Sequence, residues 1–276
     1  MDQQKPERIA KVLARAGLCS RREAERWIEA GRVQVDGKTL SSPAFTVDQT
    51  NLIVVDGKPL AEPQETRLWR YHKPTGLVTT HKDPQGRPTV FERLPKELGR
   101  VISIGRLDLN SEGLLLLTND GELARRMEMP ATGWVRRYRV RVRGTVDEDK
   151  LKKLKDGITI AGVNYGSIDA VLDSKTRTNA WLSVALSEGK NREIRKVMEH
   201  MDLHVNRLIR LSYGPYHLDK LTRGAVQEVS AKMLRNQLSD DDAKTTGKTR
   251  GKGWAKAKKA PKKNQKKTKD FGVFFR

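Results

Sequence analysis

The chain has 276 residues, in which 55 Lys and Arg oppose 34 Asp and Glu, giving a net charge of +21. An excess of this size predicts a polyanionic partner such as nucleic acid. No apolar run approaches the roughly 18 residues that span a bilayer, and no secretion signal is visible, so we expect neither a membrane protein nor an exported one. The single cysteine, Cys19, excludes an intramolecular disulfide and indicates a reducing compartment, so we expect a buried thiol in a cytoplasmic protein.

The first 60 residues predict a small module of two helices and short strands. Apolar residues recur at helical spacing over residues 8–16, and Ser20 and Glu23 then have the spacing of a capping box that starts a second helix. The alternating run of residues 33–35 and the apolar run of residues 53–55 are each followed by Asp-Gly-Lys. This sequence predicts a tight hairpin turn after each run.

This module is basic, and its cations gather on the helices and at the strand turns. The candidate RNA-binding residues are Arg15, Arg21, Arg22, Arg26, Arg32 and Lys38. A basic helix pair of this size suits a phosphate backbone, although a solvated face would have the same pattern. The segments 11–17, 20–24 and 31–37 resemble the S4 RNA-binding domain, over residues 6–63. The resemblance implies that the module supplies affinity and orientation rather than chemistry.

The region from residue 66 to residue 235 predicts a larger domain rich in strands. Its predicted strands are Leu68–Lys73, Leu77–Thr80, Val101–Ile104, Leu114–Leu117, Trp134–Gly144, Trp181–Leu186 and Val205–Leu211. Pro74 and Gly76 predict a hairpin between the first two of these strands. Short helices are expected over 122–127, over 150–155 and after Gly189. The polar loop 81–88 is either a lid that contacts RNA or a long connection.

One predicted strand has a cationic face. Along residues 138–143, Tyr138, Val140 and Val142 alternate with three arginines. Because side chains of a strand point alternately to its two faces, one face of this strand is apolar and the other is positively charged.

Asp108 lies in a short loop between two apolar runs of strand length, residues 101–104 and 114–117. A carboxylate held between two buried strands is positioned for chemistry, although an Asx turn that merely reverses the chain would have the same pattern. His200 and His204 lie four residues apart without a third ligand, so we expect no metal site.

Without a metal or a histidine base, Asp108 is a candidate nucleophile or general base. Arg106 and Arg195 are the cations available to keep it ionised. An aromatic side chain such as Tyr138 would stack on a base taken out of its helix. An Asp, a Tyr and an Arg on three separate segments together predict a nucleotide-modifying pocket.

Four segments resemble the RsuA/RluB-type pseudouridine synthases of ribosomal RNA. They are, in chain order, residues 71–76, 105–121, 137–140 and 188–195, and they follow one another in the same order as in that family. The resemblance implies an α+β protein, in which the S4-like module precedes a mixed, largely antiparallel sheet with flanking helices. It also implies an enzyme that isomerises uridine to pseudouridine without a cofactor or a metal.

By this resemblance Asp108 is the catalytic aspartate, which attacks or deprotonates the ribose so that the base is freed and reattached through carbon. Tyr138 holds the flipped base and assists proton removal, and Arg195 pairs with Asp108. The substrate-binding residues that the resemblance implies are Arg106, which holds the flipped-out position, Ile194, which packs beneath the site, Lys73 and Arg192. Met129-Pro130 stands where many family members have His-Pro, a departure in the region that grips RNA.

The segment 83–91 is most similar to family members that act on large-subunit ribosomal RNA. We therefore expect a monomeric synthase acting on 23S ribosomal RNA or on a ribosome-assembly intermediate. The alternatives are a 16S ribosomal RNA synthase and a non-catalytic ribosome-assembly factor. A DNA-binding protein is disfavoured because no recognition helix followed by dimer-forming heptads is visible.

The C-terminal 36 residues, 241–276, hold eleven Lys and two Arg against three Asp, a net charge of +10. A segment of this composition cannot bury a core. We expect residues 239–276 to be a disordered Lys-rich tail that adds non-specific attraction for RNA. The rest of the chain keeps about half of the positive charge, so the folded part is basic as well.

Overall fold

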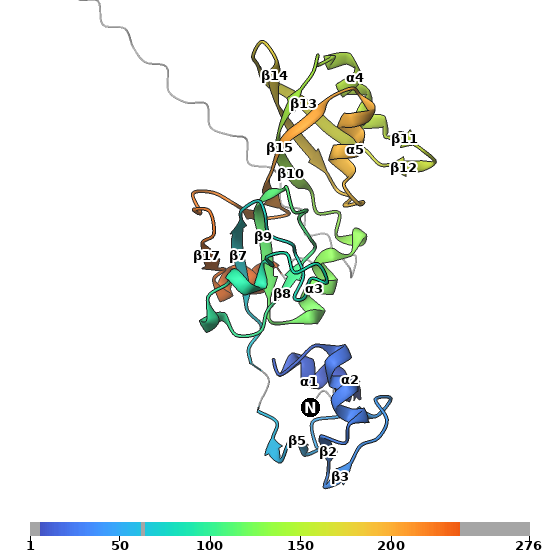
Figure 1. The fold of residues 1–276 in the computed structure, drawn as a ribbon, viewed down its shortest axis with the longest axis vertical. Helices are drawn as coiled ribbons and strands as arrows, with labels where there is room; N and C mark the ends of the chain where they lie inside the picture. The colour runs from blue at the N-terminus through green and yellow to red at the C-terminus, as the bar shows by residue number, and fades with distance from the viewer. Residues whose placement is uncertain (1–5, 62–63, 238–276) are drawn as a thin grey trace, which may run out of the picture. The chain divides into compact units, whose positions relative to one another are not determined.

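The computed structural model describes residues 6–61 and 64–237 of the chain (Figure 1). The predicted Lys-rich tail therefore lies outside the described residues. Within the described part, no helix is long and apolar enough to cross a membrane. Hydrophobic cores form separately in residues 6–61 and in residues 64–237, and the two regions are described one at a time.

The N-terminal region packs two helices, α1 (Ile9–Arg15) and α2 (Arg21–Glu29), on short strands. The predicted capping box is present, because the Ser20 hydroxyl accepts a hydrogen bond from the Glu23 N–H at 3.2 Å and the Glu23 carboxylate accepts one from the Ser20 N–H at 3.5 Å. Cys19 is buried in this core, as expected. The strands are β1 (Glu7–Arg8) paired with β4 (Thr46–Val47), and a sheet ordered β3 (Lys38–Thr39), β2 (Val33–Val35), β5 (Ile53–Val55) and β6 (Lys58–Pro59).

Both predicted hairpin turns are confirmed in this sheet. Asp36 and Gly37 have φ values of 50° and 78°, and Asp56 and Gly57 have values of 50° and 77°. Two consecutive residues with positive φ define the turn whose twist matches that of the flanking strands, and Asp-Gly is a preferred pair for it.

The C-terminal region is built on one nine-stranded sheet. Its main order is β13 (Ile168–Lys175), β14 (Asn179–Leu186), β10 (Arg136–Arg143), β15 (His204–Tyr213), β9 (Glu112–Thr118), β7 (Leu68–Lys73) and β17 (Val226–Glu228), with β16 (Tyr216–His217) on β15 and β8 (Ile102–Ile104) on β9. Only the β9–β15 pair is parallel among the described strands of this sheet. The predicted fold class, a mixed and largely antiparallel sheet, is confirmed.

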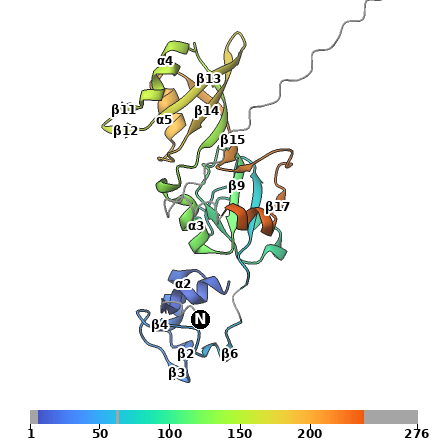
Figure 2. The same ribbon diagram turned by 180° about the vertical axis from the view of Figure 1, so that it is seen from behind.

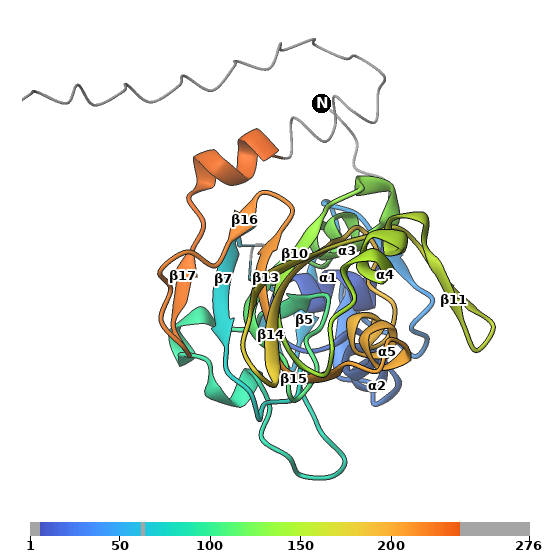
Figure 3. The same cartoon turned by 90° about the horizontal axis from the view of Figure 1, so that it is seen from above.

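Helices flank this sheet, as predicted. They are α3 (Gly121–Glu128), α4 (Glu148–Lys153) and α5 (Glu193–His200). Figure 2 shows α3 beside β9, and Figure 3 shows α4 and α5 together on one side of β10, β13, β14 and β15. Four short 3-10 helices lie at Phe91–Arg93, Lys96–Leu98, Pro130–Thr132 and Leu154–Asp156, and a separate hairpin pairs β11 (Ile158–Ile160) with β12 (Val163–Tyr165). Residues 231–237 are also helical.

The leucine run that follows Asp108 forms β9, and every residue of β9 is buried. Leu114, Leu115, Leu116 and Leu117 are each 0% exposed. β9 pairs with β7 and β15 along its two edges, and the buried leucines alternate between its two faces, so both faces are covered. A strand covered on both faces carries a continuous apolar run instead of an alternating one.

The predicted hairpin from β7 into Leu77–Thr80 is wrong. The chain turns at Gly76, with φ 84°, and its N–H donates to the Leu109 carbonyl oxygen at 2.8 Å, which directs the segment toward the Asp108 loop. Val78 then makes a single parallel bridge with Thr89. Strands β13, β16 and β17 were not predicted, because β13 lacks a regular alternation, with Val171 and Leu172 adjacent, and the other two strands are three residues long or shorter.

Candidate active site

The loop between β8 and β9 carries Asp108, and hydrogen bonds fix the backbone on both sides of it. The Thr79 hydroxyl donates to the Leu107 carbonyl oxygen at 2.8 Å, and the Gly76 N–H donates to the Leu109 carbonyl oxygen at 2.8 Å. The Leu107 side chain is buried in the core beneath the loop. The Asp108 carboxylate keeps an exposed fraction of 32%. A rigid backbone therefore presents a partly open carboxylate.

Lys73 supports the same loop from below. Its ammonium donates to the carbonyl oxygens of Pro74 at 3.0 Å, Asp108 at 3.1 Å and Ser111 at 2.9 Å, which uses all three of its N–H groups. The residue is 0% exposed. The sequence placed Lys73 among the substrate-binding residues, but a fully buried side chain whose donors are all used has no group left for a substrate. The structure gives Lys73 the role of holding the loop.

The buried position of Lys73 predicts a specific pH dependence of stability. Burial lowers the pKa of Lys73 to about 8, from 10.5 in the unfolded chain, and Arg210 acts in the same direction. Between these pH values the unfolded chain binds more protons than the folded one, so the contribution of Lys73 to stability rises with pH. In urea unfolding, the free energy of unfolding of wild type minus that of Lys73→Met should rise by about 3 kcal/mol from pH 7.5 to pH 10.5.

The Lys73→Met variant is the reference for wild type in this measurement, because all other titrating groups are common to both proteins. A stability difference that stays constant across the pH range would show that Lys73 titrates normally in the folded protein.

Two arginines lie beside the Asp108 carboxylate. Arg192 Nη1 is 3.6 Å and Arg195 Nε is 3.9 Å from Asp108 Oδ2. These separations are those of ion pairs without direct hydrogen bonds. Arg192 is the N-cap residue of α5 and has a left-handed backbone, with φ 51° and ψ 33°. The predicted pairing of Arg195 with Asp108 is present, and Arg192 is the nearer of the two cations.

Arg195 is the more firmly held of these arginines. Its Nη2 donates to the Asn110 carbonyl oxygen at 2.9 Å and its Nη1 to the Val205 carbonyl oxygen at 3.2 Å. Its Nε is buried without a hydrogen-bond partner in the described chain. Burial and the neighbouring Arg192 lower the pKa of Arg195, whereas Asp108 raises it. The guanidinium is thus fixed with one N–H available toward the carboxylate.

A cavity of about 480 Å³ opens above Asp108. Five of the residues predicted from the sequence line it: Asp108, Tyr138, Arg106, Arg192 and Ile194. Tyr138 extends from β10, Ile194 from the first turn of α5, and Arg106 from the Asp108 loop. The structure therefore gathers the predicted carboxylate, aromatic ring and cations from separate segments around one cavity.

Comparison with known proteins gives the family. The family model for RNA pseudouridylate synthase matches residues 67–200, and the S4 domain model matches residues 7–54. An uncharacterised RNA pseudouridine synthase of Rickettsia prowazekii is 50% identical over 231 residues, which cover 84% of this chain and 97% of the relative. This chain belongs to the RNA pseudouridine synthase family. It is an enzyme of that family, with an S4 RNA-binding domain in front.

Two further similarities fit this family membership. The ribosomal large subunit pseudouridine synthase B of Yersinia pestis is 42% identical to this synthase over 251 residues, which cover 88% of this chain and 79% of the relative. A crystal structure of a pseudouridylate synthase shares the fold, with a TM-score of 0.58, 24% identity, and coverage of 83% of this chain and 98% of that one.

The synthase cavity also holds residues that sequence reasoning missed. Arg210 is 2% exposed, and its Nε donates to the Leu114 carbonyl oxygen at 2.7 Å. Arg136 donates to the Glu188 carbonyl oxygen at 3.0 Å and so holds the loop before α5. Glu193 is buried, and burial raises its pKa. Arg210 could not be assigned from sequence because β15 contains two bulges against β10, which break the alternation of faces.

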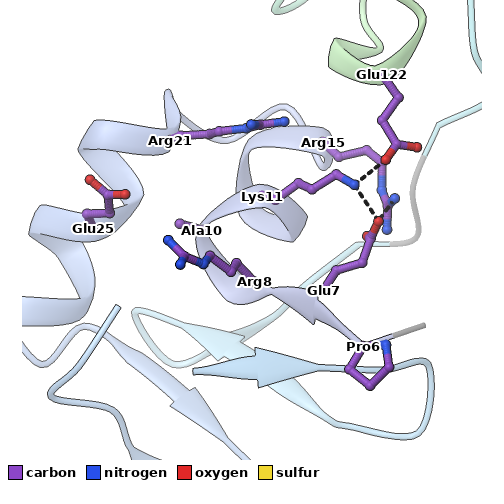
Figure 4. A pocket seen from close by; sticks show the side chains of 9 residues that line it. All are labelled: Pro6, Glu7, Arg8, Ala10, Lys11, Arg15, Arg21, Glu25 and Glu122. Atoms are coloured by element: carbon purple, nitrogen blue, oxygen red, sulfur yellow. Dashed lines mark hydrogen bonds and ion pairs between the residues drawn. The ribbon is translucent and has the colours of Figure 1, made fainter. Parts of the chain in front are cut away.

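The predicted RNA-binding residues of the S4 domain of the synthase differ in whether their side chains form ion pairs within the domain. Arg21, Arg22, Arg26 and Lys38 are exposed. Arg15 pairs with Glu7 at 2.8 Å, beside the Lys11 ammonium (Figure 4). Arg32 pairs with Asp56 at 2.5 Å and lies 4.4 Å from the centre of the Trp27 ring. The free cations are therefore those of α2 and of the first hairpin.

Proposed function

We propose that this protein isomerises a uridine to pseudouridine in large-subunit ribosomal RNA and acts in the cytoplasm, where ribosomes assemble. The observation that carries the proposal is the cavity lined by Asp108, Tyr138 and Arg192, with Arg195 as a second cation beside the Asp108 carboxylate. The choice of RNA is supported by relatives named ribosomal large subunit pseudouridine synthase B, such as that of Salmonella typhi, at 46% identity over 231 residues. The segment 83–91 supports the same choice.

The reaction needs no outside reactant, because uridine and pseudouridine are isomers. The bond between N1 of the base and C1′ of the ribose breaks, the bond between C5 and C1′ forms, and the proton of C5 is lost while N1 gains one. Asp108 starts this sequence, either by attacking C1′ or by removing a ribose proton. Arg192 and Arg195 place positive charge beside Asp108, and this charge attracts the negative charge that the base carries once the bond between N1 and C1′ has broken.

The remaining cavity residues hold the nucleotide. A uridine inside an RNA helix must be extruded before its ribose can reach a carboxylate, and aromatic rings commonly stack on an extruded base. Tyr138 provides that ring and assists removal of the C5 proton, and Ile194 packs beneath the base. Arg106 is exposed at the mouth of the cavity and holds the position from which the base has left. Arg192 contributes to binding as well as to charge stabilisation.

The test is a map of pseudouridines in ribosomal RNA from cells that lack the gene. One site in 23S ribosomal RNA should disappear and should return when the wild-type gene is restored. Loss of a site in 16S ribosomal RNA instead would overturn the choice of subunit. A map identical to that of the parent cells would overturn the proposal.

The S4 domain is proposed to supply affinity, and this proposal predicts the effect of removing its free cations. Arg22→Gln combined with Arg26→Gln removes two exposed charges of α2. Each lost phosphate contact makes the salt dependence of binding less steep, so we expect affinity for a large ribosomal RNA fragment to fall about tenfold at 0.15 M salt, with kcat unchanged. Filter binding over a salt series measures the change.

The matched control removes two lysines from the catalytic domain, Lys150→Gln with Lys153→Gln, and has the same net charge. Equal binding by the two double variants would mean that the S4 cations are only a solvated face.

A further inference from the structure

Strand β10 places four arginines in a row on one face of the sheet. Arg137, Arg139, Arg141 and Arg143 occupy alternate positions and are all exposed. We call these four residues the β10 arginine row. Alternate residues of an antiparallel strand lie ~6.8 Å apart, so the row is a closely spaced line of positive charge.

The β10 arginine row lies on the face of the sheet opposite the catalytic cavity. Tyr138, Val140 and Val142 point to the other face, where they pack with α4 and α5. Tyr138 also lines the cavity on that side. Figure 3 shows both helices on the same side of β10. The row therefore cannot touch the flipped base, and the catalytic site does not account for it.

No ion pair to a described residue compensates the charge of the β10 arginine row. None of the four arginines makes an ion pair with a described residue. On the edge strand of the same sheet, Asp173 accepts a hydrogen bond from the Ser183 hydroxyl at 2.9 Å, and Asp169 pairs with Lys155 at 3.3 Å. Like charges in one row repel one another, so an unneutralised row opposes folding slightly unless a partner supplies negative charge.

One member of the row is also arranged like a nucleic-acid contact. The Arg139 guanidinium carbon lies 4.6 Å from the centre of the half-buried Trp181 ring, on the neighbouring strand β14. Stacking on an aromatic ring holds a guanidinium flat and leaves its N–H edge free for bonding. Arginine is also the side chain that binds phosphate with two parallel hydrogen bonds.

We propose that the β10 arginine row binds the phosphate backbone of a second segment of the substrate RNA, on the face of the sheet opposite the catalytic cavity. The choice of RNA as the ligand rests on the proposed function. A closely spaced row of arginines, each of which is able to bind a phosphate with two hydrogen bonds, suits a sugar-phosphate backbone better than a folded protein surface. The row provides affinity for an extended RNA and takes no part in the chemistry.

The test compares three variants of the full-length protein. The neutral variant carries Arg139→Gln, Arg141→Gln and Arg143→Gln, and the conservative variant carries Lys at the same three positions. The matched control neutralises Lys150, Lys152 and Lys153 on α4, which are exposed on the helix side of the sheet. Binding to a long fragment of large-subunit ribosomal RNA is measured over a salt series, and pseudouridine formation is measured at saturating RNA.

The neutral variant should bind at least about tenfold more weakly at 0.15 M salt, with a log–log salt slope less steep by about 2 to 3. The conservative variant should keep the wild-type slope, and the control should stay within about twofold of wild type. Turnover at saturating RNA should be the same in all four proteins. Equal binding by the neutral variant and the control, or a conservative variant as weak as the neutral one, would overturn the proposal. If wild type forms no pseudouridine in this RNA, the proposed function fails instead.

Discussion

Replacing Asp108 with Asn should abolish pseudouridine formation while leaving the fold and RNA binding intact. The amide has the same shape as the carboxylate but is neither a nucleophile nor a base, so the rate should fall at least about 10⁴-fold. The fold should survive because the carboxylate is partly exposed, and its two ion pairs with described residues are long, at 3.6 Å and 3.9 Å. Release of tritium from RNA labelled at C5 of uridine measures the reaction, and filter binding measures affinity.

The matched control is Asp156→Asn, which removes an exposed carboxylate that does not line the cavity. Its rate should equal that of wild type. If Asp108→Asn and Asp156→Asn released tritium equally fast, another group would have to carry the chemistry, and the buried Glu193 would be the next carboxyl to replace.

Gly113→Ala should be the most damaging single substitution in the sheet. Gly113 follows the Asp108 loop, has φ 106°, and pairs with Arg210 where β9 runs parallel to β15. A Cβ at this position would lie 2.3 Å from the Arg210 carbonyl oxygen and 2.7 Å from its backbone nitrogen. Backbone atoms inside a sheet cannot move aside without breaking the pairing. We expect a loss of at least about 4 kcal/mol in the free energy of unfolding, measured by urea titration.

Gly99→Ala separates backbone strain from steric conflict. Gly99 also has a positive φ, 66°, but a Cβ there meets no atom within 4 Å. Its loss should be limited to the cost of its backbone conformation, φ 66° and ψ −152°, which is essentially confined to glycine, about 1 to 3 kcal/mol. Equal destabilisation by the two substitutions would show that φ, and not the contact with Arg210, decides the effect.

Local signals in the sequence were sufficient for much of the fold. The capping box at Ser20, the Asp-Gly turns and the leucine run of β9 each depend on neighbouring residues, and each is confirmed. The hairpin predicted after Pro74 was wrong because a long-range hydrogen bond from Gly76 to Leu109 decides where that segment goes. Strand order and the one parallel pair depend on contacts between distant residues, which no local pattern specifies.

The candidate site shows the same limit. Asp108 could be found because a polar residue between two buried strands is conspicuous, and Tyr138 and Arg195 were predicted with the help of a family resemblance. Lys73 was assigned to the substrate because its burial is not visible in a sequence. Arg210 was missed because the bulges of β15 decide which face it occupies. Sequence thus indicated the chemistry better than it indicated the residues that support it.

The parallel pairing of β9 with β15 has a consequence for how the enzyme becomes active during synthesis. Glu112 pairs with Ile209, 97 positions later in the chain, and Arg195 reaches back to Asn110. The backbone next to Asp108 therefore stays unpaired on one side until residue 209 has been synthesised. Contacts between distant residues also form slowly, because a long loop must close first. A nascent chain can fold its S4 domain early, but the loop that carries Asp108 gains these contacts only after residues 195 and 209 have been made.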